Sequence, residues 1–141
     1  MTKCRDVMTR DPISAHPEDT VAQVARLMKQ KDIGPVPIVS KNNGRNLMGI
    51  VTDRDLAIHV VAEGRDPKTT LVRDVMTTDV VTCSADDDIE LALDAMSTNQ
   101  LRRIPVVDDD NMLVGIIAQA DIATRMNKPE KTGEVVKEIS E

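Results

Sequence analysis

Residues 49–56 read Gly-Ile-Val-Thr-Asp-Arg-Asp-Leu, and residues 115–122 read Gly-Ile-Ile-Ala-Gln-Ala-Asp-Ile. In both stretches an apolar run after a glycine is typical of a strand, and the part that contains the last aspartate begins a helical pattern. Earlier segments recur in the same order: Asp6–Thr9 recurs as Asp74–Thr77, and Val36–Val39 recurs as Ile104–Val107. The copies differ in length only in the polar turns at 41–45 and 108–111. A repeat that loses residues only in a turn predicts two copies of one structural unit.

Composition narrows the class of protein. The chain has 141 residues, of which 40% are hydrophobic and 30% charged, as is typical of a soluble globular domain. Its net charge is −6 and it has no Phe, Tyr or Trp, so we expect no nucleic-acid partner. No apolar run is long enough to cross a membrane and no signal-peptide pattern is present, so we expect a cytoplasmic protein with no membrane partner.

Periodicity predicts the elements of each copy. After a helical turn at Asp-Val-Met-Thr, each copy reads β-α-β-β-α. The elements expected in the first copy are a strand at 13–15, a helix at 20–31, strands at 36–40 and 47–51, and a helix at 53–62. Those expected in the second are a strand at 80–83, a helix at 88–99, strands at 104–108 and 112–117, and a helix at 119–126. The fold class is therefore α/β, with two pseudo-symmetric units packed as one module.

The boundary between the copies is expected where Gly64–Pro67 interrupts the apolar periodicity. We place the first domain at 1–66, with its core at 6–62, and the second at 67–127, with its core at 74–126. Residues 128–141 are charged and are expected to form a tail.

The order of these motifs resembles the CBS domain. The resemblance rests on Val-Met-Thr at the start of each copy, Pro-Ile-Val or Pro-Val-Val after the first helix, and Gly-Ile-Val-Thr-x-x-Asp at the last strand. Two copies in tandem resemble a Bateman module, and the chain is similar to stand-alone bacterial two-CBS proteins of the hypoxic response protein type. The resemblance implies two clefts that bind adenine nucleotides or related ligands, no catalytic domain, and a dimer of modules.

Asp55 has two interpretations. Thr52-x-x-Asp55 fits a capping box, in which the aspartate bonds back to the first residue of the motif. A carboxylate in this place also suits the two vicinal hydroxyls of a ribose. In the second copy Ala118 cannot cap with a side chain, yet Asp121 is retained. The second copy therefore favours a ligand role for both aspartates, without excluding capping.

Basic residues are expected to hold a phosphate, by the same resemblance. Arg102 and Arg103 would serve the Asp55 site, and Arg54 would serve the Asp121 site. The alternative is that they are solvated surface charges. The residues expected at site A are Ile13, Ser14, Ile33, Gly34, Pro35, Val36, Thr52, Asp55, Arg102 and Arg103. Those expected at site B, the weaker of the two, are Val81, Thr82, Leu101, Ile104, Asp121 and Arg54.

Other chemistry has weaker support in the sequence. His16 and His59 have no Ser or Cys partner at a recognised spacing, so we expect no catalytic residues. The runs Asp86–Asp88 and Asp108–Asp110 lack a calcium-loop pattern and are expected to be a helix start and a turn. Cys4 and Cys83 follow no metal-ligand spacing and are expected to be ordinary reduced thiols.

The sequence therefore predicts a non-catalytic sensor. Its expected ligand is AMP, ADP or ATP, with NAD(H) and S-adenosylmethionine also possible, and no cofactor or metal is required. The alternatives are a ligand-free interaction scaffold and, less favoured, a nucleotide-processing enzyme. We expect a homodimer that acts on an unknown regulated protein. The apolar residues expected to be exposed on the second helices, and buried between modules, are Ile58, Val60, Val61, Ile122 and Met126.

Overall fold

The computed structural model describes residues 2–125, and side chains up to Ile122. The chain divides into two compact units. We call Ile13–Val80 the first unit, and we call residues 2–12 together with the described residues from Val81 onward the second unit. No helix within residues 2–125 has the length and apolar character that crossing a membrane requires.

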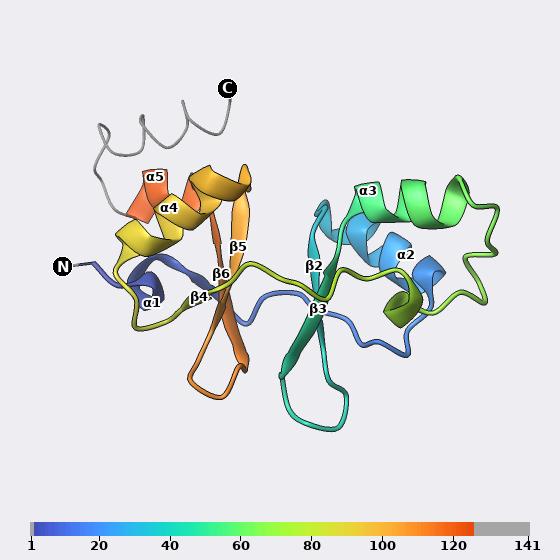
Figure 1. Cartoon of the computed structure of the whole chain (residues 1–141), viewed down its shortest axis with the longest axis horizontal. Coiled ribbons are helices and arrows are strands. Elements are labelled where there is room, and N and C mark those ends of the chain that lie inside the picture. Colours follow the sequence, from blue (N-terminus) through green and yellow to red (C-terminus); the bar gives the residue numbers. More distant parts are fainter. Residues whose placement is uncertain (1, 126–141) are drawn as a thin grey trace. The chain divides into compact units, whose positions relative to one another are not determined.

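The first unit is a β-hairpin covered by helices. Its elements are α2 (Val21–Lys31), β2 (Val36–Val39), β3 (Leu47–Val51), α3 (Asp53–Leu56), η1 (Ala57–Val61) and η2 (Val72–Asp74). Strands β2 and β3 pair in antiparallel fashion, and Figure 1 shows α2 and α3 on the same side of this hairpin. The apolar stripe of α2 supplies Val24 and Met28 to a core that includes Ile38 and Val51. Burial of this stripe is the main stabilising term for the helix.

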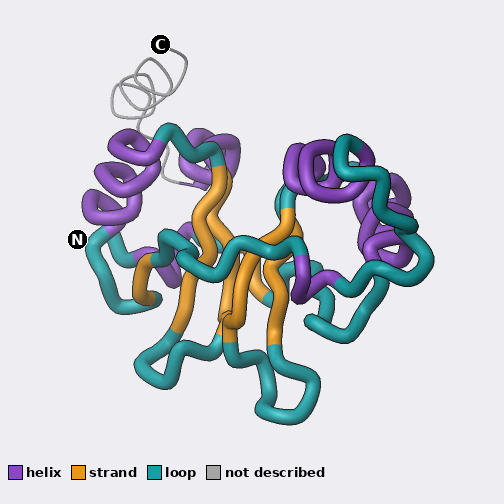
Figure 2. Tube along the Cα trace, turned by 45° about the vertical axis from the view of Figure 1, so that its right-hand side comes forward, coloured by secondary structure: helices purple, strands orange, loops and turns teal. Residues whose placement is uncertain are grey.

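The second unit repeats this plan with a larger sheet. Its elements are α1 (Cys4–Val7), β1 (Thr9–Arg10), β4 (Cys83–Ser84), α4 (Ile89–Asn99), β5 (Arg103–Val107), β6 (Leu113–Ala118) and α5 (Gln119–Arg125). The strand order is β1-β6-β5-β4, in which β4 runs parallel to β5 and the other pairs are antiparallel. Figure 2 draws these strands in orange, as it does β2 and β3 of the first unit. The mixed α/β architecture of two repeated units confirms the predicted fold class.

Each unit contains the opening segment of the other repeat. Residues 2–10, the N-terminal strap, dock on the second unit: the Cys4 N–H donates to the Asp87 carbonyl at 2.9 Å, and the Ile89 N–H donates to the Thr2 carbonyl at 2.9 Å. Residues 70–77, the linker strap, dock in the same way on the first unit, where the Val72 N–H donates to the Asp19 carbonyl at 2.8 Å. The compact units therefore differ from the sequence copies at 1–66 and 67–127, because the two copies exchange their straps.

Two glycines allow the straps to approach the sheets. A Cβ atom on Gly49 would lie 2.8 Å from the carbonyl oxygen of Thr77 and 2.9 Å from the sulfur of Met76. A Cβ atom on Gly115 would lie 2.5 Å from the sulfur of Met8. Another segment therefore lies where a Cβ atom would be at both positions, and glycine leaves the room for it.

The long elements agree with the sequence prediction, and the short ones differ. Helices α2 and α4 begin after the capping residues Thr20 and Asp88, as expected. The strand expected at 13–15 reduces to a single bridge between Ala15 and Ile38. It stops there because the His16 N–H donates to the Asp19 carboxylate at 2.9 Å instead of to a neighbouring strand.

The strand expected at 80–83 likewise forms only as β4, Cys83–Ser84. The helix expected at 53–62 is α-helical only as far as Leu56 and then widens, so that the Ala62 N–H donates to the Ala57 carbonyl. Apolar periodicity cannot distinguish this wider turn from a regular one. The tail expected at 128–141 lies outside the described residues.

The prediction of exposed apolar residues on the second helices was partly wrong. Val60 is 2% exposed and packs with Val21 and Val75, and Ile122 is 1% exposed in the core of the second unit. Both side chains face the core because the straps dock there. Ile58 and Val61 are exposed as predicted, and Met126 lies outside the described residues.

Candidate functional site

Asp55 makes both bonds of a capping box. Thr52 caps α3, and its hydroxyl accepts a hydrogen bond from the Asp55 N–H at 3.1 Å. In return, Oδ2 of Asp55 accepts a hydrogen bond from the Thr52 N–H at 3.0 Å. The carboxylate is thereby held at the junction of β3 and α3, and its capping role is confirmed.

Asp121 occupies the equivalent place in the second unit. Its Oδ2 accepts a hydrogen bond from the Ala118 N–H at 3.0 Å, although Ala118 has no side chain that can return a bond. The Thr9 hydroxyl, from the N-terminal strap, donates to the same oxygen at 3.4 Å. Thr9 was not among the expected site residues, although its recurrence as Thr77 in the Asp-Val-Met-Thr repeat was a signal that could have identified it.

Asp55 and Asp121 each have one carboxylate oxygen for which no hydrogen bond is found within residues 2–125. Every hydrogen bond found for the side chains of Asp55 and Asp121 within residues 2–125 is to Oδ2. An ionised carboxylate accepts hydrogen bonds at both oxygens. Oδ1 of each side chain is therefore available to a ligand, and capping does not compete with a binding role.

In each unit the loop after the first long helix lies against the helix that carries the carboxylate. A Cβ atom on Gly34 would lie 3.2 Å from Oδ1 of Asp53, so the loop before β2 approaches the start of α3 closely. In the second unit the Arg102 carbonyl accepts a hydrogen bond from the Gln119 N–H at 2.9 Å, at the start of α5. Each unit thus brings its predicted loop residues to the helix turn that contains Asp55 or Asp121.

The other residues predicted at the two sites, apart from the aspartates, the arginines and Thr52, differ in their exposure to solvent. Ile13 is exposed, and Ser14, Ile33, Gly34 and Pro35 are partly exposed. In the second unit Val81, Thr82 and Leu101 are partly exposed. The side chains of Val36 and Ile104 are fully buried in the cores of their units, so they can support a site but cannot line its surface.

The predicted arginines lie in different units from the aspartates that they were expected to serve. Arg102 and Arg103 are exposed residues of the second unit, at the start of β5, whereas Asp55 belongs to the first. Arg54 is exposed in the first unit, whereas Asp121 belongs to the second. Both pairings across the units remain predictions.

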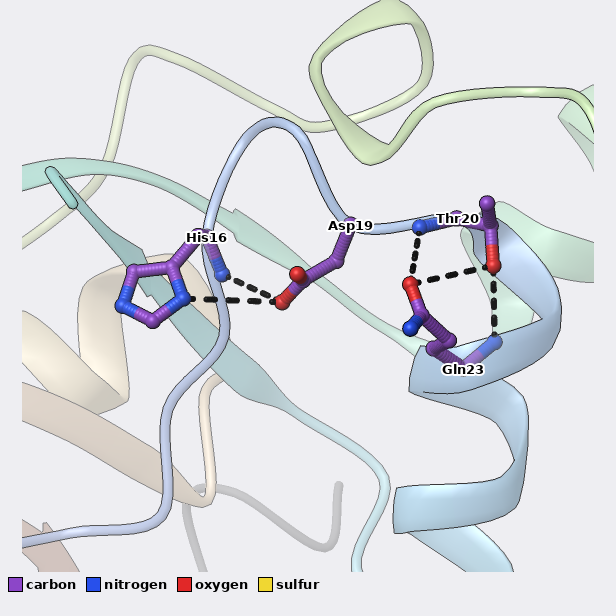
Figure 3. Close-up of polar contacts among 4 residues, drawn as sticks. All are labelled: His16, Asp19, Thr20 and Gln23. Atoms are coloured by element: carbon purple, nitrogen blue, oxygen red, sulfur yellow. Dashed lines mark hydrogen bonds and ion pairs between the residues drawn. The ribbon is translucent and has the colours of Figure 1, made fainter.

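A separate hollow lies along α2 in the first unit. Its volume is about 320 Å³, and its lining residues are Ser14, Ala15, Asp19, Gln23, Val24, Arg26, Leu27 and Gln30. Two of the lining residues belong to polar pairs that Figure 3 shows, Asp19 with His16, and Gln23 with Thr20 in the capping box of α2. The hollow shares only Ser14 with the predicted site A, so it is a different surface.

The polar clusters that could have indicated catalysis or metal binding have structural roles. Asp86 forms an ion pair with Arg5, Asp87 accepts a hydrogen bond from the Ser84 N–H, and Asp88 caps α4. The predicted helix start is therefore confirmed. The part of the chain that the structure describes contains no group of three His, Cys, Asp or Glu residues that could hold a metal ion.

A family model and a similar protein sequence both match this chain to the CBS domain. The family model of the CBS domain matches residues 4–62 and 72–128. The CBS domain-containing protein YhcV of Bacillus subtilis is 37% identical over 140 residues, which cover 99% of this chain and 96% of that protein.

Two solved structures are also similar. Hypoxic Response Protein I, crystallised with two coordinated zinc ions, is 34% identical and has a TM-score of 0.78 over 88% of this chain and 98% of that one. The CBS domain pair of MJ0100, in complex with 5-methylthioadenosine and S-adenosyl-L-methionine, is 28% identical and has a TM-score of 0.73 over 87% of this chain and 98% of that one.

Proposed function

Because this chain belongs to the CBS domain family, we propose that it is a non-catalytic sensor that binds an adenosine-containing ligand at Asp55 and, more weakly, at Asp121. The observation that carries the proposal is the hydrogen bonding of these two carboxylates. Each has one oxygen fixed by backbone at a strand–helix junction and one oxygen without a hydrogen bond from residues 2–125.

The ribose supplies the chemistry that fits these carboxylates. Its two vicinal hydroxyls are donors, and an ionised carboxylate is acceptor-only, so the pairing is charge-assisted. Fixing Oδ2 before the ligand arrives lowers the entropic cost of binding. The similar CBS pair of MJ0100 was crystallised with two compounds that both contain adenosine, which supports this ligand class.

The remaining parts of the ligand would meet aliphatic and basic residues. The chain has no aromatic side chains, so an adenine ring would lie against aliphatic groups such as Ile13, Ile33 and Pro35. Arg102 and Arg103 would hold a phosphate, as the family resemblance implies. AMP, ADP and ATP satisfy both requirements, and NAD(H) and S-adenosylmethionine share the adenosine part.

Site A is proposed as the stronger of the two. Thr52 supplies a hydroxyl beside Asp55, whereas Ala118 supplies none beside Asp121. Thr9 partly compensates, because its hydroxyl donates to Asp121, but that bond occupies the same oxygen that the backbone already uses. We therefore expect unequal affinities.

The proposed mechanism is a shift between conformations of a homodimer. A ligand changes such an equilibrium only by binding one conformation more tightly than the other. Val61 is 77% exposed and Ile58 is 40% exposed on one helical segment of the first unit, and we propose this apolar surface as the dimer interface. The regulated protein would then respond to the altered dimer.

A thermal-shift series tests the proposal directly. The purified chain is heated with adenosine, AMP, ADP, ATP, NAD and S-adenosylmethionine, and with guanosine and inorganic phosphate as controls. A ligand present at 100 times its Kd adds about 2.7 kcal/mol to the free energy of unfolding, which raises the melting temperature. If no adenosine compound raises it at millimolar concentration, the chain is an interaction scaffold. If the bound nucleotide is consumed, the chain is an enzyme.

A further inference from the structure

The two cysteines of the chain meet in the core of the second unit. Cys4 comes from the N-terminal strap and is 0% exposed, and Cys83 comes from β4 and is 6% exposed. Both belong to the same apolar cluster, and neither is in a disulfide. Their separation in the sequence hides this contact, which depends on the docking of the strap.

Backbone hydrogen bonds join the N-terminal strap to the residues that follow β4. The Cys4 N–H donates to the Asp87 carbonyl at 2.9 Å, and the Arg5 N–H donates to the Ala85 carbonyl at 3.1 Å, just after β4. An ion pair between Arg5 and Asp86 closes the same junction. The strap therefore holds Cys4 against the chain that follows Cys83.

The thiols also differ in acidity. The Cys4 thiol donates to the Asp88 carbonyl at 4.0 Å, and the Cys83 thiol donates to the Pro105 carbonyl at 3.9 Å. The neighbouring Cys83 thiol lowers the pKa of Cys4, whereas the Cys4 thiol and burial raise the pKa of Cys83. Cys4 is therefore the thiol that ionises first. Since the thiolate is the reactive form of cysteine, Cys4 is the nucleophile of the pair.

Packing alone does not require two cysteines here. In the first unit the equivalent places are taken by Val72 and Ala15, which are 0% and 4% exposed in the corresponding core. Val72 makes the same backbone bond as Cys4, from its N–H to the Asp19 carbonyl at 2.8 Å. The same architecture is thus built with two ordinary apolar residues.

We propose that Cys4 and Cys83 form a redox pair whose oxidation to a disulfide ties the N-terminal strap to the body of the second unit. The oxidant is a low-molecular-weight disulfide such as oxidised glutathione. Both thiols are buried, so the reaction proceeds through local opening of the strap.

The exchange balances in two steps. The Cys4 thiolate attacks one sulfur of the oxidant, which forms a mixed disulfide and expels one small thiolate. Cys83 then loses its proton to solvent and attacks the sulfur of Cys4, which forms the protein disulfide and expels the second small thiolate. Two protein thiols are oxidised, and one small disulfide is reduced to two thiols.

The expected consequence lies at Asp121. The strap carries Thr9, which donates a hydrogen bond to that carboxylate. A covalent tie at Cys4 holds the strap on its sheet and so keeps Thr9 in place. This consequence rests on the proposed ligand role of Asp121, whereas formation of the disulfide does not.

Mass spectrometry tests the pair without any ligand. The reduced full-length chain is equilibrated with graded ratios of oxidised to reduced glutathione, quenched, denatured and alkylated. We expect monomeric protein that loses both alkyl labels together as the ratio rises, and that regains both after treatment with dithiothreitol. Retention of both labels at every ratio, disulfides only between chains, or glutathione adducts without an internal disulfide would overturn the proposal.

The first unit supplies the matched control. The double variant Cys4→Val/Cys83→Ala has the residues of the first unit at these places, so it should fold and show no redox response. Each single variant should stop at the mixed disulfide or stay reduced. Hydrogen exchange of the wild type should then slow on oxidation at Thr9 and Arg10, which pair with β6, and stay unchanged at Thr77, which pairs with Ile50. Equal exchange of Thr9 in both redox states would show that the disulfide does not tie the strap.

Discussion

The Thr9 hydroxyl donates a hydrogen bond to Oδ2 of Asp121 at 3.4 Å, and this bond joins the opening strap of one repeat to the last helix of the other. The straps are exchanged between the copies, so the Asp121 carboxylate accepts a hydrogen bond from the other repeat. The equivalent threonine of the linker strap, Thr77, makes backbone bonds to Ile50, and no side-chain hydrogen bond is found for it within residues 2–125.

The first prediction compares these two threonines. Thr9→Val removes a hydroxyl that binds a carboxylate and keeps a side chain that favours a strand. Because the bond is long and exposed, we expect a loss of about 0.5–1 kcal/mol in the free energy of unfolding, the lower part of the range for one hydrogen bond. Thr77→Val should change it by less than about 0.5 kcal/mol. Urea denaturation measures both, and equal losses would contradict the assigned role of Thr9.

The second prediction separates ligand binding from capping. Asp55→Ala should remove most of the melting-temperature rise caused by an adenosine ligand, and Asp121→Ala should remove less of it. Both substitutions also remove a cap, so each variant is compared with its own ligand-free melting temperature. Gln23→Ala is the control, because it breaks the capping box of α2, a helix that carries none of the predicted site residues. Loss of a cap costs about 0.5–2 kcal/mol.

An Asp55→Ala variant that keeps the full ligand-induced rise would show that Asp55 only caps α3. Equal effects of the two aspartates would show that the sites are equivalent, contrary to the proposed inequality.

The third prediction concerns phosphate. If Arg102 and Arg103 hold it, replacing both with Gln should weaken a nucleotide by about 1.5–3 kcal/mol for each charged hydrogen bond lost, while adenosine binds as before. The ratio of nucleotide to nucleoside affinity, measured by calorimetry, is therefore the informative quantity. Lys41→Gln removes an exposed cation in the turn between β2 and β3 and should leave the ratio unchanged. An unchanged ratio in the arginine double variant would make these residues surface charges.

The repeat and the long helices could be predicted because their signals are local. Thr20 and Asp88 cap α2 and α4, and the apolar stripes of these helices follow the 3.6-residue period. The short strands could not be placed from the sequence. At Ala15 only one residue pairs, and the turn that ends it depends on the Asp19 carboxylate three residues away from His16.

The exchange of the straps between the copies limited how much of the candidate site could be predicted from the sequence. Asp55, Asp121 and Thr52 were recognisable from motif spacing, and the structure places them at the strand–helix junctions. Thr9 and the meeting of Cys4 with Cys83 depend on which copy each strap joins. A repeated sequence is compatible with either copy, so spacing alone cannot decide between them.

The fourth prediction tests the strap contacts through glycine. Gly49→Ala places a Cβ atom 2.8 Å from a backbone oxygen of Thr77, which cannot turn aside. We expect a loss of about 1–3 kcal/mol in the free energy of unfolding, as for other overpacked sites. At Gly115 the nearest atoms to the new Cβ are Sδ and Cγ of Met8, which another rotamer can move, and the Met8 Cβ at 3.0 Å, which needs only a small shift.

Gly115→Ala should therefore cost less than Gly49→Ala in urea denaturation, and Met8→Ala should relieve the strain it creates. A larger cost at Gly115 than at Gly49 would contradict the difference between a backbone and a side-chain obstacle.

The fifth prediction concerns assembly. Val61 is 77% exposed, and an apolar side chain so exposed beside Ile58 is suited to an interface between copies. A buried carboxylate without a partner disfavours association, so Val61→Glu should shift the light-scattering mass at micromolar concentration from that of a dimer toward the monomer mass of 15.5 kDa. Leu91 is 56% exposed on α4 and serves as the control, since Leu91→Glu adds the same charge on another surface and should leave the dimer intact. A wild-type mass of 15.5 kDa would reject the dimer itself, and dissociation by Leu91→Glu alone would move its interface to α4.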